Sequence, residues 1–438
     1  SSADLRPVDH GSTVRGGNHP GHRPAPGYRP PGPDQLIPTC IRVPIQSGKP
    51  EGASTVGTRH PSFDFDFHGA ALDTIFDDYE VMQRDCPVSW SDRYGGFWTI
   101  TSYADVCAAE HDWDTFSVGP SMILPSFGTD RPLIPLDIDP PALTRFRQIL
   151  LPFFTPQRMD TLLPRTYEIA RQLLDDMEDG EVVDAAPYSR LLPAMVFGEY
   201  CGFPMADAAQ FDQWVDDIVF ARTDDESVAR SAAADVYDYF RALIALRRHD
   251  PGSDVISALL AADHAGGPLD DDEMLDICYL LFVAGLETTA GTIRVGLWHL
   301  AQHPDELALL AADPSLIPAA TEEFLRALSP VQAMARTLRL DTRIGDVQMR
   351  AGERVVLAFG AANRDPEVFD CPHDVRIDRS PNAHVAFGIG AHRCLGSNLA
   401  RREVNVALEE FIRRFPRFEL AEPAPWHGVG RLAIRPLP

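Results

Sequence analysis

The sequence is almost without lysine. Only Lys49 is a lysine among the 39 basic residues, so nearly every positive charge is an arginine and no single arginine is informative by its type alone. The 64 acidic residues give a formal net charge of −25. A charge of this sign argues against nucleic acid or an anionic membrane as the main partner, because both attract basic surfaces.

Paired cysteines and long apolar runs are also missing. The seven cysteines are scattered and form no C-x-x-C, which does not predict a disulfide framework and is typical of a reducing cytoplasm. The longest apolar stretch, residues 277–286, is too short to span a bilayer. The first thirty residues carry no signal-peptide pattern. We therefore expect a cytoplasmic protein without a membrane anchor.

Proline and glycine divide the chain into two parts. Seven prolines lie between positions 20 and 38, and residues 1–57 show neither helical nor strand periodicity. This composition is typical of a mobile or surface-wrapped arm. Residues 58–438 contain no internal repeat and no linker that would separate two cores, so they are expected to form one domain.

Helical spacing of apolar residues dominates that domain, and we expect one large, mainly α fold with a small β region. The strand signals are the run at 97–100 and the alternating residues at 335–360. The segments expected to be helical are 103–111, 157–177, 205–222, 226–248, 271–300, 315–328 and 395–414.

The most specific pattern is FGIGAHRCLG at residues 387–396, in which glycines lead to a cysteine at the start of a helix. Glycines permit positive φ and let a flat group approach the backbone. Amides at a helix N-terminus favour a thiolate over a thiol. The alternative is a structural cysteine beside a turn, which is the usual fate of a single buried Cys.

A second pattern, AGLETT at residues 284–289, lies within an apolar helix. An acidic residue in a buried helix is costly unless it is paired or functional. Small residues at 284 and 285 leave space beside Thr288. The alternative is a helix kink with a threonine that hydrogen-bonds to its own backbone.

Together these patterns resemble the cytochrome P-450 family. The resemblance implies a heme b cofactor with Cys394 as the sulfur ligand of the iron, in a loop that includes Phe387, Gly388, His392 and Gly396. It also implies that Thr288 hydrogen-bonds to dioxygen and that Glu287 helps to relay protons. The resemblance covers about residues 60–438.

Two further groups of residues gain meaning from this resemblance. Glu323, Arg326 and Arg379 match a buried structural network of the family. Arg147, Arg336 and His392 match partners of the heme propionates. The family often has a histidine four residues before Arg147, whereas this chain has Leu143, which puts the first of these contacts in doubt.

The resemblance implies a monooxygenase that inserts one atom of O₂ into a hydrophobic small molecule. The chain has no G-x-G-x-x-G after a strand, so we expect electrons from a ferredoxin or flavodoxin with its reductase. A basic patch for that partner and ordinary solvated charge are equal alternatives for Arg145, Arg393, Arg401 and Arg402.

The substrate itself is not specified by the sequence. Apolar candidates for its pocket favour a hydrophobic molecule, although core packing explains any one of them equally well. Two other functions are considered, a heme-thiolate peroxygenase and a noncatalytic heme-binding sensor, and the acid–alcohol pair argues against both. The candidate pocket residues are Met122, Ile123, Leu124, Phe127, Ala284, Gly285, Val331 and Met334.

Overall fold

The computed structural model describes residues 62–438 except 178–179, 262–266 and 428–429. All the described elements belong to one compact unit, Cys40–Pro438. The predicted arm, residues 1–57, lies outside the described residues, and so do residues 58–61 of the predicted domain.

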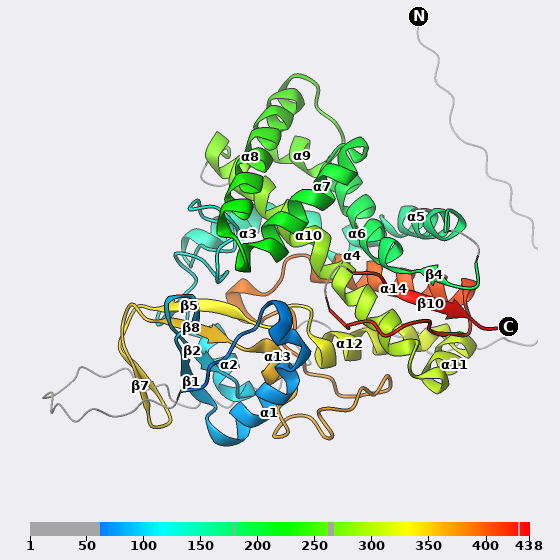
Figure 1. The fold of residues 1–438 in the computed structure, drawn as a ribbon. Helices are drawn as coiled ribbons and strands as arrows, with labels where there is room; N and C mark the ends of the chain where they lie inside the picture. The colour runs from blue at the N-terminus through cyan, green and yellow to red at the C-terminus, as the bar shows by residue number, and fades with distance from the viewer. Residues whose placement is uncertain (1–61, 178–179, 262–266, 428–429) are drawn as a thin grey trace, which may run out of the picture. The chain divides into compact units, whose positions relative to one another are not determined.

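The helix α10 (Asp271–Leu300) is the central element, and four helices make the most extensive contacts with it (Figure 1). It begins with a capping box, in which the Asp270 carboxylate accepts from the Glu273 N–H and the Glu273 carboxylate accepts from the Asp270 N–H. By length and composition it could cross a membrane, but 67% of its most apolar window is buried within the protein. It is therefore the core helix, packed against α6 (Ala186–Cys201), α8 (Glu226–His249), α12 (Ile317–Leu328) and α14 (Ser397–Arg414).

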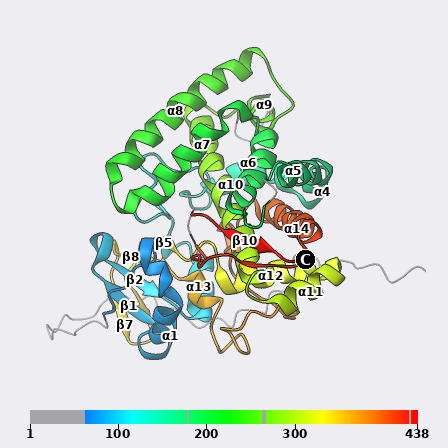
Figure 2. The ribbon, with the colours of Figure 1, turned by 45° about the vertical axis from the view of Figure 1, so that its right-hand side comes forward.

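The remaining helices are shorter and surround this group. In Figures 1 and 2, α7, α8 and α9 lie together above α10, on the side away from α1. The other α-helices are α1 (Ile75–Asp85), α2 (Tyr103–His111), α3 (Ala142–Leu150), α4 (Pro156–Asp160), α5 (Leu163–Asp175), α7 (Ala208–Val215), α9 (Val255–Ala261), α11 (Pro304–Ala312) and α13 (Phe359–Ala362). Single turns of 3₁₀ or π-helix are η1 (Gly69–Asp73), η2 (Arg93–Gly95), η3 (Leu151–Phe154), η4 (Met205–Asp207), η5 (Asp216–Phe220), η6 (Ala221–Thr223), η7 (Pro314–Leu316) and η8 (Gly390–His392).

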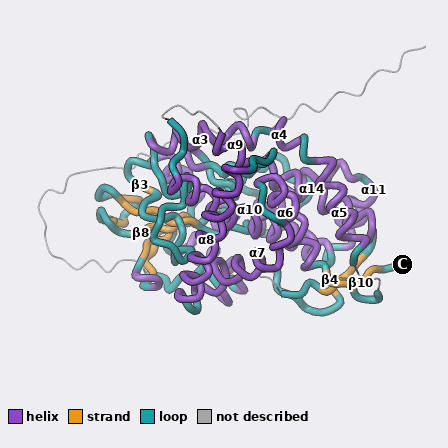
Figure 3. The backbone as a smooth tube through the Cα atoms, turned by 90° about the horizontal axis from the view of Figure 1, so that it is seen from above, coloured by secondary structure: helices purple, strands orange, loops and turns teal. Residues whose placement is uncertain are grey.

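The strands of the described residues form three small sheets. The largest has the order β1-β2-β8-β5-β3, with β2 parallel to β8 and the other pairs antiparallel. The second has the order β4-β10-β9 and lies on the other side of the helices from β3 and β8, as Figure 3 shows. The third is the hairpin β6-β7. Their bounds are β1 (Val88–Ser91), β2 (Phe97–Ile100), β3 (Phe116–Ser117), β4 (Val183–Asp184), β5 (Met334–Leu338), β6 (Thr342–Ile344), β7 (Val347–Met349), β8 (Arg354–Leu357), β9 (Phe418–Leu420) and β10 (Ala433–Pro436).

The predicted mainly α fold with a small β region is confirmed, and α2 and α10 have the predicted bounds. The segment 157–177 is instead two helices, α4 and α5. The sequence analysis missed α6 entirely. Its buried residues lie on most of its sides, so no helical period is visible, and Pro193 interrupts its interior.

The predicted network around Glu323 is buried and holds the chain that leads into the cysteine loop. Arg326 Nε and Nη2 donate to the two Glu323 carboxylate oxygens at 2.8 Å, and Arg379 Nε donates to both at 3.0 Å. Asn382 Nδ2 also donates to Glu323, at 3.1 Å. Since one carboxylate offers about four acceptor positions, it can hold both guanidinium groups and the amide at once.

Candidate active site

The cysteine loop is a tight turn closed by its own backbone. The Cys394 N–H donates to the Phe387 carbonyl oxygen at 2.8 Å. Gly388 and Gly390 have φ of 61° and 69°, which strains a residue with a side chain. A Cβ on Gly390 would also lie 3.0 Å from the Glu110 carbonyl oxygen. The two glycines therefore allow the loop to lie directly against α2.

Cys394 lies just before α14, close to several positive charges. The residue is exposed, although enough protein surrounds its sulfur for burial to raise the pKa of the thiol. The Cys394 side chain is therefore accessible from one direction and surrounded by protein in the others. The Gly396 N–H, Arg393, Arg401 and Arg147 act in the opposite direction and lower the pKa. These groups oppose the effect of burial without outweighing it, so the pKa of the Cys394 thiol stays above its ordinary value.

Two residues of the central helix are exposed although those around them are buried. Ala284 and Thr288 lie one turn apart on one face of α10, and both are exposed, whereas Leu286 and Thr289 are buried. The Thr288 hydroxyl donates to the Ala284 carbonyl oxygen at 2.9 Å. An accessible strip on a core helix is the kind of surface that a bound molecule covers.

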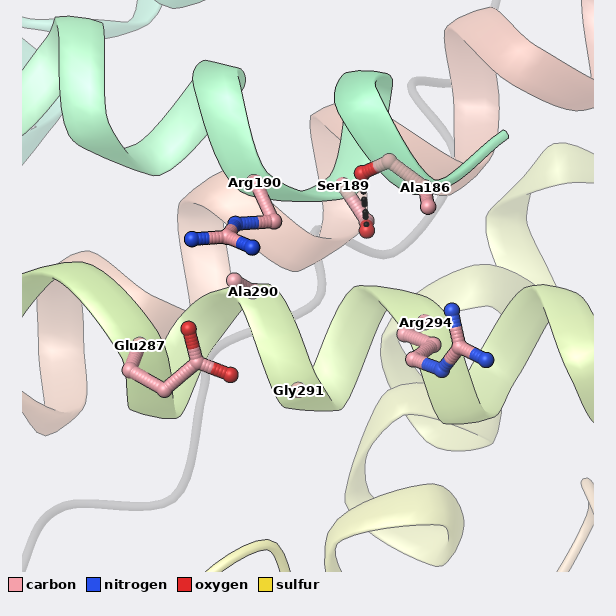
Figure 4. A pocket seen from close by; sticks show the side chains of 7 residues that line it. All are labelled: Ala186, Ser189, Arg190, Glu287, Ala290, Gly291 and Arg294. Carbon is pink, nitrogen blue, oxygen red and sulfur yellow. Dashed lines mark hydrogen bonds between the residues drawn. The ribbon is translucent and has the colours of Figure 1, made fainter. Parts of the chain in front are cut away.

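Glu287 lies on another face of the same helix, against α6 (Figure 4). It lines a cavity of about 10 Å³ together with Arg190, Arg294 and small residues, close to the smallest volume that holds one water molecule. Burial raises the pKa of Glu287 to about 7. Arg190 opposes this rise, while Asp216 and Asp212 add to it. Glu287 can therefore gain and lose a proton near neutral pH.

Arg147 and His392 are the two predicted propionate partners whose donors remain free, although His392 is not the cation that was expected. Arg147 is half-buried and forms no hydrogen bond or ion pair within the described part of the chain. His392 Nε2 is buried 3.7 Å from Asp139 Oδ1, beyond hydrogen-bonding distance. Burial first, and then Arg336, lower the pKa of His392 to about 4, so its ring is neutral at pH 7. Each side chain can donate to an anion bound between them.

Arg336 has a protein partner that the sequence did not indicate. It is buried in β5 and forms an ion pair with Glu110 of α2, and its Nη1 donates to the Ala335 carbonyl oxygen at 2.8 Å. Glu110 Oε2 also accepts from the Ile389 N–H at 3.3 Å. Only part of the Arg336 donor set therefore remains for another anion. Glu110 links Arg336 to the cysteine loop, and no local motif marks it.

Phe387 is held from the side by a charged cluster. The Arg401 guanidinium lies 4.5 Å from the centre of the Phe387 ring. Arg401 Nε donates to Glu322 Oε1 at 2.6 Å, and His384 Nε2 lies 2.9 Å from Glu322 Oε2. Glu322 thus fixes two side chains that pack around the aromatic residue next to Cys394. The sequence analysis missed its role.

Three of the four arginines considered for a basic patch are paired within the protein. Arg145 forms an ion pair with Glu273, Arg401 pairs with Glu322, and Arg402 pairs with Asp160. Arg393 is exposed and forms no ion pair with the described residues. The four side chains therefore do not make a patch of free positive charge.

Comparison with known proteins identifies this arrangement. The cytochrome P450 family model matches residues 205–313 and 314–425. The 6-deoxyerythronolide B hydroxylase of Saccharopolyspora erythraea is 33% identical over 363 residues, which cover 77% of this chain and 90% of that protein. The chain belongs to the cytochrome P450 family.

Solved structures of P450s agree with this assignment. The bacillaene polyketide synthase cytochrome P450 PksS of Bacillus subtilis is similar with a TM-score of 0.76 and 32% identity, over 83% of this chain and 96% of that chain. P450BioI, in complex with an acyl carrier protein ligated to hexadec-9Z-enoic acid, has a TM-score of 0.75 and 30% identity, over 83% and 99% of the chains. The protein is thus a P450 monooxygenase, and P450s bind heme b.

The described residues fit a heme. Cys394 would supply a sulfur ligand to the heme iron, and the exposed strip of small residues on α10 would lie against the ring. The unpartnered, buried His392 Nε2 would donate to a propionate. A Cβ on Gly396 would meet nothing within 4 Å, so the backbone there is also accessible. Met122 is buried and its carbonyl oxygen accepts from the Ala335 N–H, whereas the other candidate pocket residues of that loop are half-buried.

Proposed function

We propose that this P450 inserts one oxygen atom from O₂ into a hydrophobic small molecule in the cytoplasm, with electrons from a ferredoxin or flavodoxin and its reductase. The observation that carries the proposal is the pair of polar groups on α10. The Thr288 hydroxyl is accessible beside Ala284. The residue directly before it, Glu287, has a carboxyl group with a pKa of about 7. An enzyme that reduces O₂ needs protons at this place, whereas a peroxygenase or a sensor does not.

The bound heme supplies the iron at which O₂ is reduced. In our proposal the heme is held by residues of the cysteine loop, α3 and β5. Cys394 gives the sulfur ligand, and Phe387, Gly388 and Gly396 shape the loop around it. Arg147, His392 and the free donors of Arg336 hold the propionates through charge-assisted hydrogen bonds.

Thr288 and Glu287 have different roles in proton transfer in this proposal. The Thr288 hydroxyl donates to the Ala284 carbonyl oxygen, and rotation about its χ1 can redirect the O–H to a molecule beside α10. Glu287 exchanges protons with water in the cavity that Arg190 shares. A carboxyl group with a pKa close to the working pH is suited to this exchange.

The source of electrons is tested by reconstitution. The heme-loaded protein should form no product with NAD(P)H alone and should form product when a ferredoxin, or a flavodoxin, and its reductase are added. Comparable turnover with hydrogen peroxide alone would favour a peroxygenase. Oxygen binding without product for any hydrophobic compound tested would favour a sensor. Catalysis with NAD(P)H and no added protein would contradict the need for a partner.

A further inference from the structure

One buried arginine of this P450 has no carboxylate to offset its charge. Six arginines are buried among the described residues. Three of them form direct ion pairs, and the charges of two others are offset by nearby carboxylates. The sixth, Arg222, is 8% exposed, and the Tyr94 hydroxyl, rather than a carboxylate, is the group that raises its pKa. Burial lowers the pKa of Arg222 to about 10, so it remains a cation at neutral pH.

The contacts of Arg222 use only part of its guanidinium. Nε donates to the Pro125 carbonyl oxygen at 3.3 Å, and the group lies 4.9 Å from the centre of the Phe127 ring. Neither Nη atom has a hydrogen-bond partner within the described part of the chain. Neither Nη atom is among the buried polar atoms that lack a partner, so the remaining exposed area of Arg222 includes both. Their four N–H groups are therefore free to donate to a molecule bound beside them.

The neighbours of Arg222 carry no negative charge that could serve. Tyr94 donates its hydroxyl hydrogen to Asp66 at 2.8 Å, and burial raises the pKa of that hydroxyl, so Tyr94 is neutral. The Asp66 carboxylate already accepts from the Tyr94 hydroxyl and, at 2.9 Å, from Arg93 Nη1. His68 donates from Nε2 to the Leu124 carbonyl oxygen at 2.6 Å, and burial and Arg222 lower its pKa to about 4.

Arg222 lies beside the loop that carries four of the candidate pocket residues of the sequence analysis. It belongs to η6, and the loop 118–141 contributes both Pro125 and Phe127. A Cβ on Gly128 of this loop would lie 2.3 Å from the Ala229 carbonyl oxygen, so the loop and the first turns of α8 are in direct contact. The Phe127 carbonyl oxygen accepts from the Tyr279 hydroxyl at 2.6 Å, which places Phe127 next to α10.

We propose that Arg222 binds the carboxylate of the substrate, so that this P450 oxidises a hydrophobic carboxylic acid. The proposal rests on the proposed function and adds the substrate class to it. A guanidinium with two free Nη atoms can donate two parallel hydrogen bonds to one carboxylate. The Phe127 ring covers one side of that pair and limits its contact with water. A neutral or a cationic substrate would bring no negative charge to pair with Arg222.

The position of Arg222 also predicts where such an acid is oxidised. Tyr279, which contacts Phe127, precedes Thr288 by nine residues, or about 14 Å along the helix. A carboxylate at Arg222 therefore lies far from the place where Thr288 acts. We expect an extended acid to be hydroxylated on carbons remote from its carboxylate.

The experiment measures binding to the heme-loaded protein by the shift of its absorption spectrum. The probes are tetradecanoic acid and methyl tetradecanoate at pH 7.5, which differ mainly in charge. The acid should bind at least about tenfold more tightly than the ester, because a charge-assisted hydrogen bond is worth about that factor. Arg222→Gln should remove this preference by weakening the acid alone, and Arg222→Lys should retain part of it.

Two controls separate this result from general damage. Arg230→Gln removes an exposed arginine of α8 that pairs with Glu226, and it should leave the preference unchanged. If Arg222→Gln does not retain heme, Arg222→Met, which keeps an unbranched apolar stem, replaces it. An acid that binds the unaltered protein no better than its ester, including the case in which neither binds, overturns the assignment. So does a preference that survives the loss of Arg222. Failure of the proposed function would appear separately, as no product with the redox partners.

Discussion

Glu287 and Thr288 are consecutive residues of α10, but their side chains leave the helix on different faces. Thr288 is exposed beside Ala284, whereas Glu287 points into the cavity that it shares with Arg190 (Figure 4). Successive residues of a helix are rotated by about 100°, so neighbours cannot share one face. The acid and the alcohol that look like one unit in the sequence therefore lie on different faces of the helix, and in the proton relay that we propose a water molecule would connect them.

Removal of the Thr288 hydroxyl should uncouple electron use from product formation. Thr288→Ala keeps the helix and its accessible face but has no donor at that position. We expect heme and substrate binding to be unchanged, while product per electron falls by about tenfold and hydrogen peroxide rises. The matched control is Thr292→Ala, which removes the same group from a buried position one turn away. Unchanged product per electron in Thr288→Ala would show that the relay assignment is wrong.

Glu287 should make the stability of the protein depend on pH. Its pKa is about 7 in the folded protein and 4.5 in the unfolded chain, so the folded state keeps a proton that the unfolded state has lost between these values. The folded state therefore loses stability as pH rises from about 4.5 to 7, by up to about 3 kcal/mol, and the loss is complete above pH 7. Glu287→Gln lacks this dependence.

The measurement for Glu287 is thermal unfolding of the two proteins across this pH range. The advantage of Glu287→Gln over the unaltered protein should be small near pH 4.5 and largest above pH 7. Glu181→Gln, at a side chain that is 87% exposed, serves as the control and should show no such trend. A difference between Glu287→Gln and the unaltered protein that is constant with pH would contradict the burial of this carboxyl group.

The parts that the sequence predicts are those that depend on local pattern. The cysteine loop needs glycines at fixed positions, and α10 follows from the helical spacing and apolar composition of its residues. The ion pair between Arg326 and Glu323 also follows from local spacing, because residues three apart share a helix face.

The parts that the sequence does not predict depend on contacts between distant segments. α6 has buried residues on most of its sides and shows no helical period, so neither its existence nor the position of Arg190 is visible before α6 and α10 pack together. Glu110 lies on a short helix, 226 residues from Arg336, and looks like an ordinary surface acid. Arg222 stands out only after folding, because its exposure and its lack of a carboxylate are tertiary properties.

The thiolate assignment of Cys394 has a direct spectroscopic test. Cys394→Ser replaces the sulfur with an oxygen of similar size in the same loop. We expect the reduced, carbon monoxide-bound protein to lose the absorption band that is specific to a thiolate ligand. Cys371→Ser is the matched control, because Cys371 is also exposed but lies outside the glycine loop. Retention of the band in Cys394→Ser would remove the basis of the assignment and of the proposed function.

The last prediction concerns Arg147 and Leu143, which lie one turn apart on α3. Leu143 is 2% exposed, and both residues line a hollow of about 260 Å³ that also borders Gly390 and Ala391 of the cysteine loop. In many P450s a histidine at the first position shares the binding of a propionate with the arginine. Leucine has no donor, so we propose that Arg147 holds that propionate from α3 alone.

Arg147→Ala should therefore release heme faster. Loss of one partner from a buried charge pair costs about 3–5 kcal/mol, and since Arg147 is only half-buried we expect an increase of about tenfold or more in the rate. Leu143→His should be tolerated and should slow heme loss, because the added ring can donate to the same carboxylate from one turn away. The measurement is the rate of heme transfer to an excess of an acceptor protein. Gln148→Ala, an exposed change on the same helix beside the same hollow, should leave this rate unchanged. If Arg147→Ala behaves like Gln148→Ala, Arg147 is a solvated helix charge and the propionate is held by His392 and Arg336.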